Sequence, residues 1–528
     1  MVLKTKILEG EYFWGGDAGS GWQMPVCQGV AYECDCRYDS TTQYMPLYLS
    51  TKGRYAWSET GMKATACGDE ITFESETDIE LNEGGTCLRD AYLNAMEKHF
   101  PFEETCKKGK VLPREFFKSA QFNTWVEFAY DQNQKGILEY AHALIDNGFK
   151  PGIFMIDEGW QARYGQWKFD LHKFPDPKAM LKELHDLGFI VMLWVTPYVS
   201  PEGVDFCKAT GALFNPHTYK DLFLRTDTGE VAIVGWWNGY SAILDLRKEC
   251  DRHYLSERLD FLMEEYGVDG FKFDGGGYDS YAPYNIKNGK PRADHDQGEL
   301  NIAWNEFGAR YKYHEYKDTF KGGGKPTIQR LWDREHRWEG GSGITSIVPT
   351  SILQGLFGHP FICPDMIGGG SWTDDYQPNF KIDEELFIRW AQLSSMFPMM
   401  QFSRAPWKCL SQKSLDIVMR WYNHHINMAD EIGRLVENAE KTGEPILRCL
   451  EYNDPHKGYA HITDEFMLGE NILVCPVVTK GTRKKEITLP NGCWQDEDGN
   501  IYEGGQTLTL PTPLEKLLWF KRIDKRAF

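Results

Sequence analysis

The sequence lacks the features that mark several large classes of protein. No run approaches the ~20 apolar residues that cross a bilayer, and the N-terminus lacks the ~7 to 15 apolar residues of a signal peptide. There is no P-loop, no HExxH and no GxGxxG between a strand and a helix, and the 13 cysteines form no cluster with zinc spacing. We therefore expect a bacterial cytoplasmic protein with reduced thiols, no cofactor, no bound metal and no membrane contact.

Positive charge is also scarce. The chain has 58 Lys and Arg against 77 Asp and Glu, a formal net charge of −19. This balance excludes binding to nucleic acid or to an anionic membrane through bulk electrostatics. What is abundant is aromatic: 18 Trp and 26 Tyr in 528 residues. That composition indicates a globular chain, and its length exceeds what one hydrophobic core supports, so several domains are expected.

The patterning predicts three domains. Residues 1–112 contain short alternating runs such as YMPLYLS and DEITFES and no long helical period, which predicts an N-terminal β-sandwich. Residues 113–435 repeat strand, loop and helix. Residues 436–528 return to short β runs such as NILVCPVV and KKEITLP, which predict a small all-β C-terminal domain, again a sandwich.

The middle region predicts a (β/α)8 TIM barrel of class α/β. Helical stretches such as QKGILEYAHALIDNG and PKAMLKELHDLG end in a glycine suited to a C-cap, and a proline opens the second. The strand candidates that alternate with such helices are FNTWVEF, GIFMIDE, IVMLWVTP, AILDL, GFKFD, TIQRLW, PFICPD and MMQFS.

Acidic residues follow these strands where a barrel enzyme builds its site. Asp157, Asp245, Asp274 and Asp365 end or adjoin strand candidates, and Asp333 follows TIQRLW directly. Cleavage of a glycoside needs two carboxylates, one as nucleophile or base and one as general acid. Two of these acids, at 274 and 333, end consecutive strand candidates and are the candidate pair. Taken alone, the spacing leaves loop capping as the alternative for each.

Several motifs follow one another in a characteristic order: FMIDEGW, WWNGYSAILDL, GFKFDGG, RLWDREHRW, GHPFICPDMIGG and ELFIRWAQLSSMFPMMQFS. In this order the sequence resembles glycoside hydrolase family 31 over essentially the whole chain, most weakly before residue 110. Within the family it is most similar to the α-galactosidase and myogenesis-regulating glycosidase group.

The resemblance implies a retaining mechanism and assigns its two acids. The family's strand-end nucleophile falls on Asp274. Its acid/base falls on Asp333, five residues before Trp338, with Glu335 as the rival in the same segment. The implied carboxyl separation is ~5 to 5.5 Å.

Lys272 points to the sugar. Many α-glucosidases of the family have a bulky apolar residue two positions before the nucleophile, whereas the KxD pattern resembles that of α-galactosidases. Strand alternation places Lys272 on the same side as Asp274. A buried lysine needs a partner. It either forms a structural Lys–Asp ion pair or donates to a sugar hydroxyl, with Asp274 or Asp245 balancing its charge.

Other residues are expected to bind substrate by resemblance. In MIDEGW, Asp157 is expected to bind O4, and Glu158 replaces an apolar neighbour common in glucosidases. Tryptophans are expected to wall the sugar, although packing in the barrel wall is an equal alternative for each. The further substrate-binding candidates are Trp194, Trp236, Trp237, Lys317 and Arg330.

Two positions depart from the family pattern. Lys317 stands where many members have arginine, and Pro406 stands where many glucosidases have histidine. Both positions usually contact O2 or O3, so the site could take another group at C2, such as N-acetyl. The triple glycines at 275–277, 322–324 and 368–370 are expected to give room beside a sugar. Asp365 is expected to order its loop, and His359 to pack.

The leading hypothesis is therefore a retaining exo-acting α-glycoside hydrolase for terminal α-linked hexoses, in particular α-galactosides. The enzymatic alternatives are an α-glucosidase, an α-N-acetylgalactosaminidase or another specificity of the family. The alternative of another class is a catalytically dead carbohydrate-binding protein. The expected partner is an oligosaccharide or glycoconjugate. Linkage, aglycone and oligomeric state, a homo-oligomer included, stay open.

Overall fold

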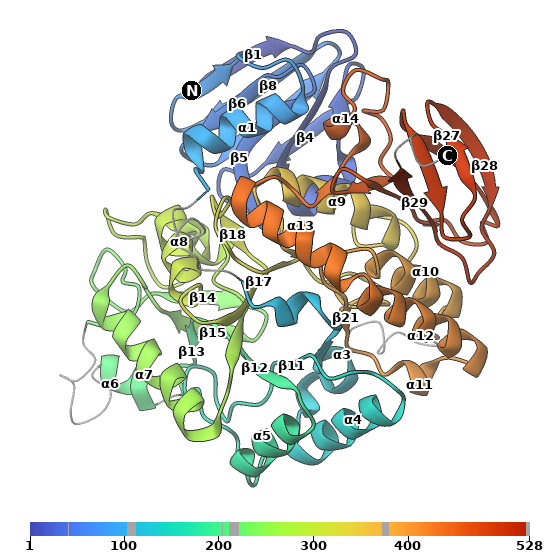
Figure 1. The fold of residues 1–528 in the computed structure, drawn as a ribbon. Coiled ribbons are helices and arrows are strands. Elements are labelled where there is room, and N and C mark those ends of the chain that lie inside the picture. The colour runs from blue at the N-terminus through green and yellow to red at the C-terminus, as the bar shows by residue number, and fades with distance from the viewer. Residues whose placement is uncertain (41, 103–111, 203, 211–220, 372–379, 524–528) are drawn as a thin grey trace. The chain divides into compact units, whose positions relative to one another are not determined.

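The computed structural model describes residues 1–40, 42–102, 112–202, 204–210, 221–371 and 380–523 (Figure 1). The chain divides into two compact units. One unit comprises residues 1–37, 44–120 and 323–528, and the other comprises residues 38–43 and 121–322. No helix in the described part of the chain is long and apolar enough to cross a membrane. The end of the predicted first domain falls on residues 103–111, outside the described ranges.

The N-terminal region is rich in antiparallel sheet, as predicted. One sheet has the order β1-β8-β7-β4 and another includes β3-β2-β5-β6-β9. The runs YMPLYLS and DEITFES lie in β5 and β8. The strand bounds are β1 Val2–Lys6, β2 Tyr12–Asp17, β3 Val26–Cys27, β4 Tyr32–Asp35, β5 Gln43–Ser50, β6 Tyr55–Ser58, β7 Met62–Cys67, β8 Glu70–Ser75 and β9 Ile79–Asn82.

A helix in this region was not predicted. Helix α1 (Leu88–His99) buries Leu88, Ala91, Tyr92 and Ala95, which recur at intervals of three and four residues. That spacing places them on one face of a helix. The expectation of a region without helix is therefore wrong here, because the apolar face of α1 is narrow and charged residues interrupt it.

The predicted TIM barrel is confirmed. Its strands have the sheet order β20-β19-β17-β16-β12-β11-β10-β21. In one unit, β10, β11, β12, β16 and β17 pair in parallel, each with the next. In the other unit, β19 and β20 pair in parallel. The bounds are β10 Gln121–Asn123, β11 Ile153–Ile156, β12 Ile190–Val195, β16 Gly270–Phe273, β17 Tyr313–Tyr316, β19 Gln329–Arg330, β20 Ile362–Cys363 and β21 Gln401–Phe402.

One of the eight predicted barrel strands is wrong. AILDL contributes to β15 (Gly239–Ile243), which lies in a separate antiparallel sheet with β13 (Tyr198–Val199) and β14 (Ile233–Trp236). Ile243 of this run packs in a local cluster with Tyr198 and Val234. The missed barrel strand is β17, whose sequence YHEY has no apolar run although all four residues are buried. The prediction that Asp274 and Asp333 end consecutive strands is wrong for the same reason, since β17 comes between β16 and β19.

A second predicted strand is shorter than expected. FNTWVEF is a strand only as far as Asn123, and Trp125–Phe128 form helix α3. The Trp125 N–H donates to the Asn123 side-chain oxygen at 2.7 Å. This bond offers the backbone an alternative to the strand ladder, as Asn side chains often do.

The predicted helices are present, and their ends follow local chemistry. Asn133 and Asp176 cap α4 and α5 by accepting from backbone N–H groups. Gly148 and Gly188 follow these helices with positive φ, as C-terminal glycines do. The bounds are α4 Gln134–Asp146, α5 Pro177–Asp186, α6 Val204–Thr210, α7 Glu249–Tyr266, α8 Gln297–Gly308, α9 Ile347–Leu356, α10 Glu384–Ser394, α11 Pro406–Cys409, α12 Gln412–Asn427 and α13 Ala429–Thr442.

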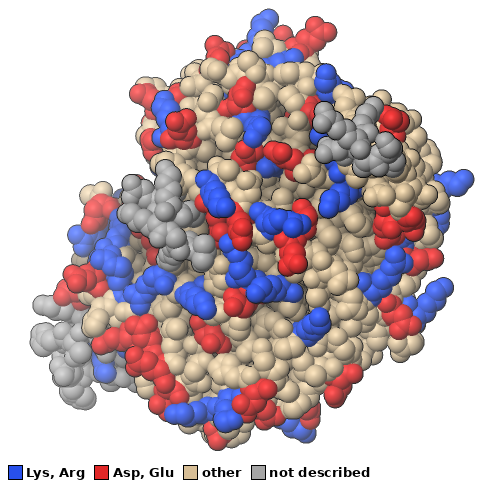
Figure 2. All heavy atoms as spheres, in the orientation of Figure 1, with Lys and Arg blue, Asp and Glu red and all other residues tan. Residues whose placement is uncertain are grey.

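The C-terminal region is mainly β, as predicted. Helix α13 continues through the predicted boundary at 435, and the sheets follow it. A core that includes Trp494, Leu473 and Phe520 joins them. The bounds are β22 Leu447–Arg448, α14 Leu450–Asn453, β23 Phe466–Leu468, β24 Ile472–Cys475, β25 Lys484–Leu489, β26 Cys493–Asp496, β27 Ile501–Glu503, β28 Gln506–Pro511 and β29 Leu518–Ile523. On the face drawn in Figure 2, basic and acidic side chains lie interspersed.

Candidate active site

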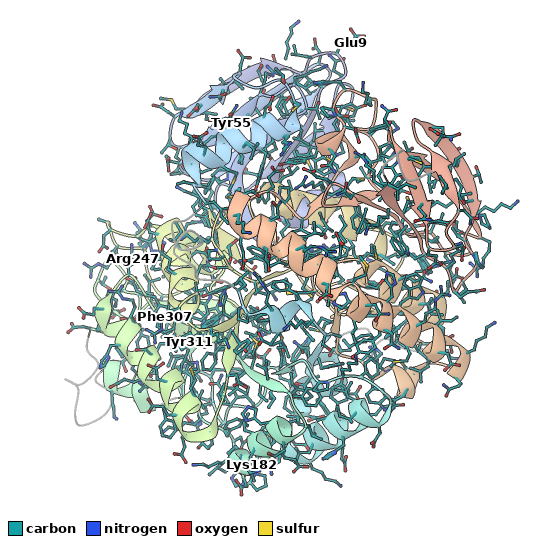
Figure 3. All side chains as sticks on the ribbon, viewed as in Figure 1. Glu9, Tyr55, Lys182, Arg247, Phe307 and Tyr311 are labelled. Carbon is teal, nitrogen blue, oxygen red and sulfur yellow. The ribbon has the colours of Figure 1, made fainter. Side chains whose placement is uncertain are left out.

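Strand β16 directs two polar side chains to one face. The rings of Phe271 and Phe273 lie 5.0 Å and 6.0 Å from that of Tyr311, and the Phe273 ring also lies 6.5 Å from that of Phe307 in helix α8. Figure 3 labels Tyr311 and Phe307. Because successive side chains of a strand point to opposite faces, Lys272 lies on the face opposite these rings, as the sequence predicts, and Asp274 follows at the strand's carboxyl end.

Asp274 is buried among donors. Its side chain is 8% exposed. Lys317 Nζ lies 3.1 Å from Oδ1, and Trp194 Nε1 donates to Oδ2 at 3.0 Å. Lys272 Nζ lies 3.8 Å from Oδ2. A cation and a donor on separate oxygens favour the charged form and hold the carboxylate in one orientation, which is the state a nucleophile needs.

Lys317 reaches Asp274 through strand register. β16 and β17 are parallel, and Phe273 faces Tyr316. Asp274 directly follows β16 and Lys317 directly follows β17, so the two side chains lie at neighbouring strand ends. Lys317 is thus brought to the site as predicted, but the strand that carries it was missed.

Lys272 forms the buried ion pair that the sequence left as one of two alternatives. Its Nζ lies 2.7 Å from Asp157 Oδ2, and both side chains are at most 4% exposed. Asn123 Nδ2 donates to the same oxygen at 2.7 Å. The alternative counter-ion Asp245 is wrong, because it pairs with Arg247 instead.

Glu158 accepts hydrogen bonds from three side chains. Tyr164 Oη donates to Oε1 at 2.7 Å, Trp237 Nε1 donates to Oε2 at 3.0 Å, and the Asn238 amide donates to Oε1. Burial raises the pKa of Glu158 to about 7, although the bonds from Tyr164 and Trp237 lower it. Tyr164 and Asn238 were not predicted, because they are isolated polar residues in loops.

The tryptophans take different positions. Trp194 is buried and contacts Asp274 through its indole N–H. Trp236 stacks on Tyr198 with ring centroids 4.4 Å apart, which is a packing role. Trp237 is 51% exposed. Of the tryptophans predicted to wall the sugar, Trp194 and Trp237 lie beside Asp274 and Gly275.

The glycines after Asp274 serve the backbone. Gly275 and Gly276 have φ of +61° and +63°, a conformation that side chains disfavour. A Cβ on Gly275 would lie 2.8 Å from the Tyr198 ring, and one on Gly276 would lie 2.9 Å from Pro197. The expectation that they give room to the substrate is wrong, because protein atoms occupy that space.

Asp333 lies in the other unit in a more open setting. Its side chain is 41% exposed, and Arg330 Nη1 lies 3.0 Å from its Oδ1. Arg330 is fully buried and also pairs with buried Asp365. Asp365 accepts from the Arg334 N–H at 2.7 Å, so it orders this loop as expected. Burial raises the pKa of Asp365, against the effect of Arg330.

The Glu335 carboxylate accepts hydrogen bonds from side chains that lie within seven residues in the sequence. Its Oε2 accepts from Arg337 Nη1 at 2.6 Å and from Ser342 Oγ at 2.8 Å. His359 is buried, and desolvation lowers its pKa to about 3, so it stays neutral. These contacts agree with a structural role for both residues.

Family models match two long stretches of the chain. The model of the glycosyl hydrolases family 31 TIM-barrel domain matches residues 120–421. The chain belongs to glycosyl hydrolase family 31. The family's C-terminal domain matches residues 443–524. The boundaries at 112/113 and 435/436 stay predictions.

Curated relatives in family 31 have diverse names. The chain is 29% identical to the myogenesis-regulating glycosidase of Mus musculus over 426 residues, 78% of this chain and 57% of that protein. It is 25% identical to alpha-glucosidase 2 of Bacillus thermoamyloliquefaciens, covering 74% of this chain and 50% of that protein. The chain thus spans about half the length of these relatives.

A solved structure shows the same fold. The family 31 dextranase of Flavobacterium johnsoniae, complexed with glucose, superimposes with a TM-score of 0.80 at 18% identity, over 99% of this chain and 66% of that one. At this identity the likeness supports the architecture of this family 31 chain and leaves its substrate open.

Proposed function

We propose that the protein is a retaining exo-acting α-glycoside hydrolase whose preferred substrates are terminal α-galactosides. The observation that carries the proposal is the setting of Asp274. It is a buried carboxylate at the carboxyl end of a barrel strand, paired with Lys317 at 3.1 Å and oriented by Trp194 at 3.0 Å. Barrel enzymes place their catalytic groups at such strand ends.

In the first step, an Asp274 oxygen attacks the anomeric carbon while the bond to the leaving oxygen breaks. Asp333 gives its proton to that oxygen. In the second step, water loses a proton to Asp333 and attacks the same carbon, and the ester to Asp274 breaks. Two inversions leave the product in the α configuration. The 41% exposure of the Asp333 side chain suits a group that exchanges protons with leaving groups and water.

The preference for galactosides is supported by Lys272 and Asp157. An ammonium has three donors, and among the described residues the Lys272 ammonium pairs only with the carboxylates of Asp157 and Asp274. It can donate to a sugar hydroxyl while the ion pair keeps it in place. A site built to hydrogen-bond one hydroxyl discriminates against a sugar that places this group elsewhere. An apolar residue at 272 would give no such selection.

The test is turnover of p-nitrophenyl α-glycosides of galactose, glucose, N-acetylgalactosamine and xylose. We expect release from the galactoside with kcat/KM at least tenfold above the others, and NMR should detect the α anomer of galactose first. Preference for another sugar would overturn the galactoside assignment and leave the mechanism. Silence on every sugar, with galactose binding retained in calorimetry, would favour the carbohydrate-binding alternative.

A further inference from the structure

The carboxylate of Glu158 accepts hydrogen bonds from three protein donors. Both oxygens accept: Oε1 from Tyr164 and Asn238, and Oε2 from Trp237. The residue is 3% exposed. Trp237 and Asn238 form the tip between β14 and β15, whereas Glu158 follows β11 by two residues. Glu158 therefore ties the tip of this hairpin to the end of a barrel strand.

Trp237 presents its ring next to the nucleophile. A Cβ on Gly275 would lie 3.3 Å from the Trp237 ring, and Lys317 Nζ lies 6.0 Å from its centroid. Gly275 follows Asp274 in the chain, and Lys317 pairs with it. Trp237 is also 51% exposed. An exposed indole thus stands beside Asp274, and its N–H is anchored on a buried acceptor.

We infer that Glu158 is a positioning residue that holds Trp237 as an aromatic platform for the substrate beside Asp274, and that it is not itself a ligand of the sugar. The inference rests on the proposed function for the nature of the substrate. It departs from the prediction that Glu158 binds the sugar, because three protein donors already occupy its oxygens. An indole has an apolar body and a polar edge, and here the polar edge is bound while the body is exposed.

The protonation state of Glu158 decides how many hydrogen bonds its carboxyl can accept. Burial raises its pKa to about 7; the bonds from Tyr164 and Trp237 lower it, and nearby Asp157 and Asp274 raise it. The other ionisable groups facing this cluster are Tyr130, which bonds Asn238, Lys272, which pairs with Asp157, and Lys317, which lies over Trp237. A protonated carboxyl turns one acceptor oxygen into a donor. As pH falls through about 7, the cluster therefore loses an acceptor and the hold on Trp237 weakens.

Kinetics between pH 5 and pH 9 test this role. In the wild type we expect KM to rise several-fold as pH falls below about 7. Glu158→Leu removes the acceptor, and we expect KM to rise roughly 10- to 100-fold at every pH, the equivalent of losing a hydrogen bond to a charged group, with kcat within a few-fold. Glu158→Gln mimics the protonated carboxyl, with one acceptor oxygen at every pH, so its KM should match that of the wild type at low pH, stay below that of Glu158→Leu and lose its pH dependence. The control is Glu139→Leu, at an exposed glutamate on α4.

Double variants separate the outcomes. If Glu158 acts through Trp237, Glu158→Leu combined with Trp237→Ala should bind no worse than Trp237→Ala alone. Additive losses would overturn the inference. So would an equal loss of affinity in Glu158→Gln and Glu158→Leu, because that result is expected of a direct sugar ligand. Should Glu158→Leu not fold, Trp237→Phe, which lacks the N–H, must lose the pH dependence of KM; if it keeps that dependence, the inference fails.

A measurement without substrate keeps this inference distinct from the proposed function. The difference in tryptophan fluorescence between the wild type and Trp237→Phe reports on Trp237 alone. We expect its quenching by acrylamide to increase between pH 8 and pH 5 in the wild type and to be independent of pH in Glu158→Gln. An unchanged signal in the wild type would overturn the positioning role even if galactosides are cleaved. If the quenching of Trp237 changes with pH but no glycoside is cleaved, the proposed function is contradicted and the positioning role of Glu158 is not.

Discussion

The two candidate catalytic carboxylates lie in contrasting surroundings. The Asp274 side chain is 8% exposed and is held by Lys317 and Trp194 on separate oxygens. The Asp333 side chain is 41% exposed and shares Arg330 with Asp365. The first setting holds a carboxylate in one orientation, and the second leaves it open to solvent. The same residue type thus suits a nucleophile in one place and an acid/base in the other, because the surroundings set the role.

Replacing the nucleophile should have the largest effect. Asp274→Ala removes the atom that forms the intermediate, and we expect kcat to fall by roughly 10⁴-fold or more. Circular dichroism and the melting temperature should show a folded protein. External azide, which takes the place of the carboxylate, should restore part of the turnover and give a glycosyl azide of inverted configuration. Near wild-type activity would refute the assignment of Asp274.

Replacing Asp333 should give a smaller loss that depends on the leaving group. General acid catalysis contributes roughly 10²- to 10⁴-fold, so Asp333→Ala should lose most on substrates with poor leaving groups. On a dinitrophenyl glycoside the first step needs no proton, and a burst of phenol should precede slow turnover. Glu335→Ala is the matched comparison, with an expected loss of less than threefold. If these two results were exchanged, Glu335 would be the acid/base.

Replacing Lys272 should test whether its ion pair serves the sugar as well as the fold. Lys272→Met leaves Asp157 buried with only Asn123 on that oxygen, and breaking a buried pair costs about 3 to 5 kcal/mol. Urea denaturation should measure that loss. In the protein that remains folded we expect kcat/KM for the galactoside to fall roughly 10- to 100-fold and the preference over glucoside to disappear. Unchanged selectivity would reduce Lys272 to a structural residue.

Replacing Lys317 should have the smallest effect on activity and should mainly change the pH dependence of kcat/KM. The ammonium favours the ionised form of Asp274. Without it, the carboxylate binds a proton more readily, so activity should be lost at a higher pH on the acidic side. In Lys317→Met we expect the acidic limb of kcat/KM to move to higher pH, with a loss of only a few-fold at pH 8. Lys317→Arg should retain the wild-type limb. An unmoved limb in Lys317→Met would argue that Lys272 and Trp194 are sufficient.

The strands and helices of the barrel could be predicted from the sequence where the periodicity of apolar residues is strong. Seven of the eight predicted strand segments contain a barrel strand, and the glycines at 148 and 188 end their helices. The failures have one cause. AILDL is apolar and β17 is not, yet all four residues of β17 are buried in the barrel, and no local pattern reveals this burial.

The sequence by itself determined the family of the protein and which side chains of β16 share a face. Alternation along β16 puts Lys272 and Asp274 on one side, and the order of motifs identifies family 31. The tertiary structure decided which groups meet these residues. Trp194 reaches Asp274 across 80 positions, and Trp237 reaches Glu158 across 79. Such contacts depend on strand register and on loop conformation, which arise from pairing between distant segments. Local sequence patterns therefore could not predict them.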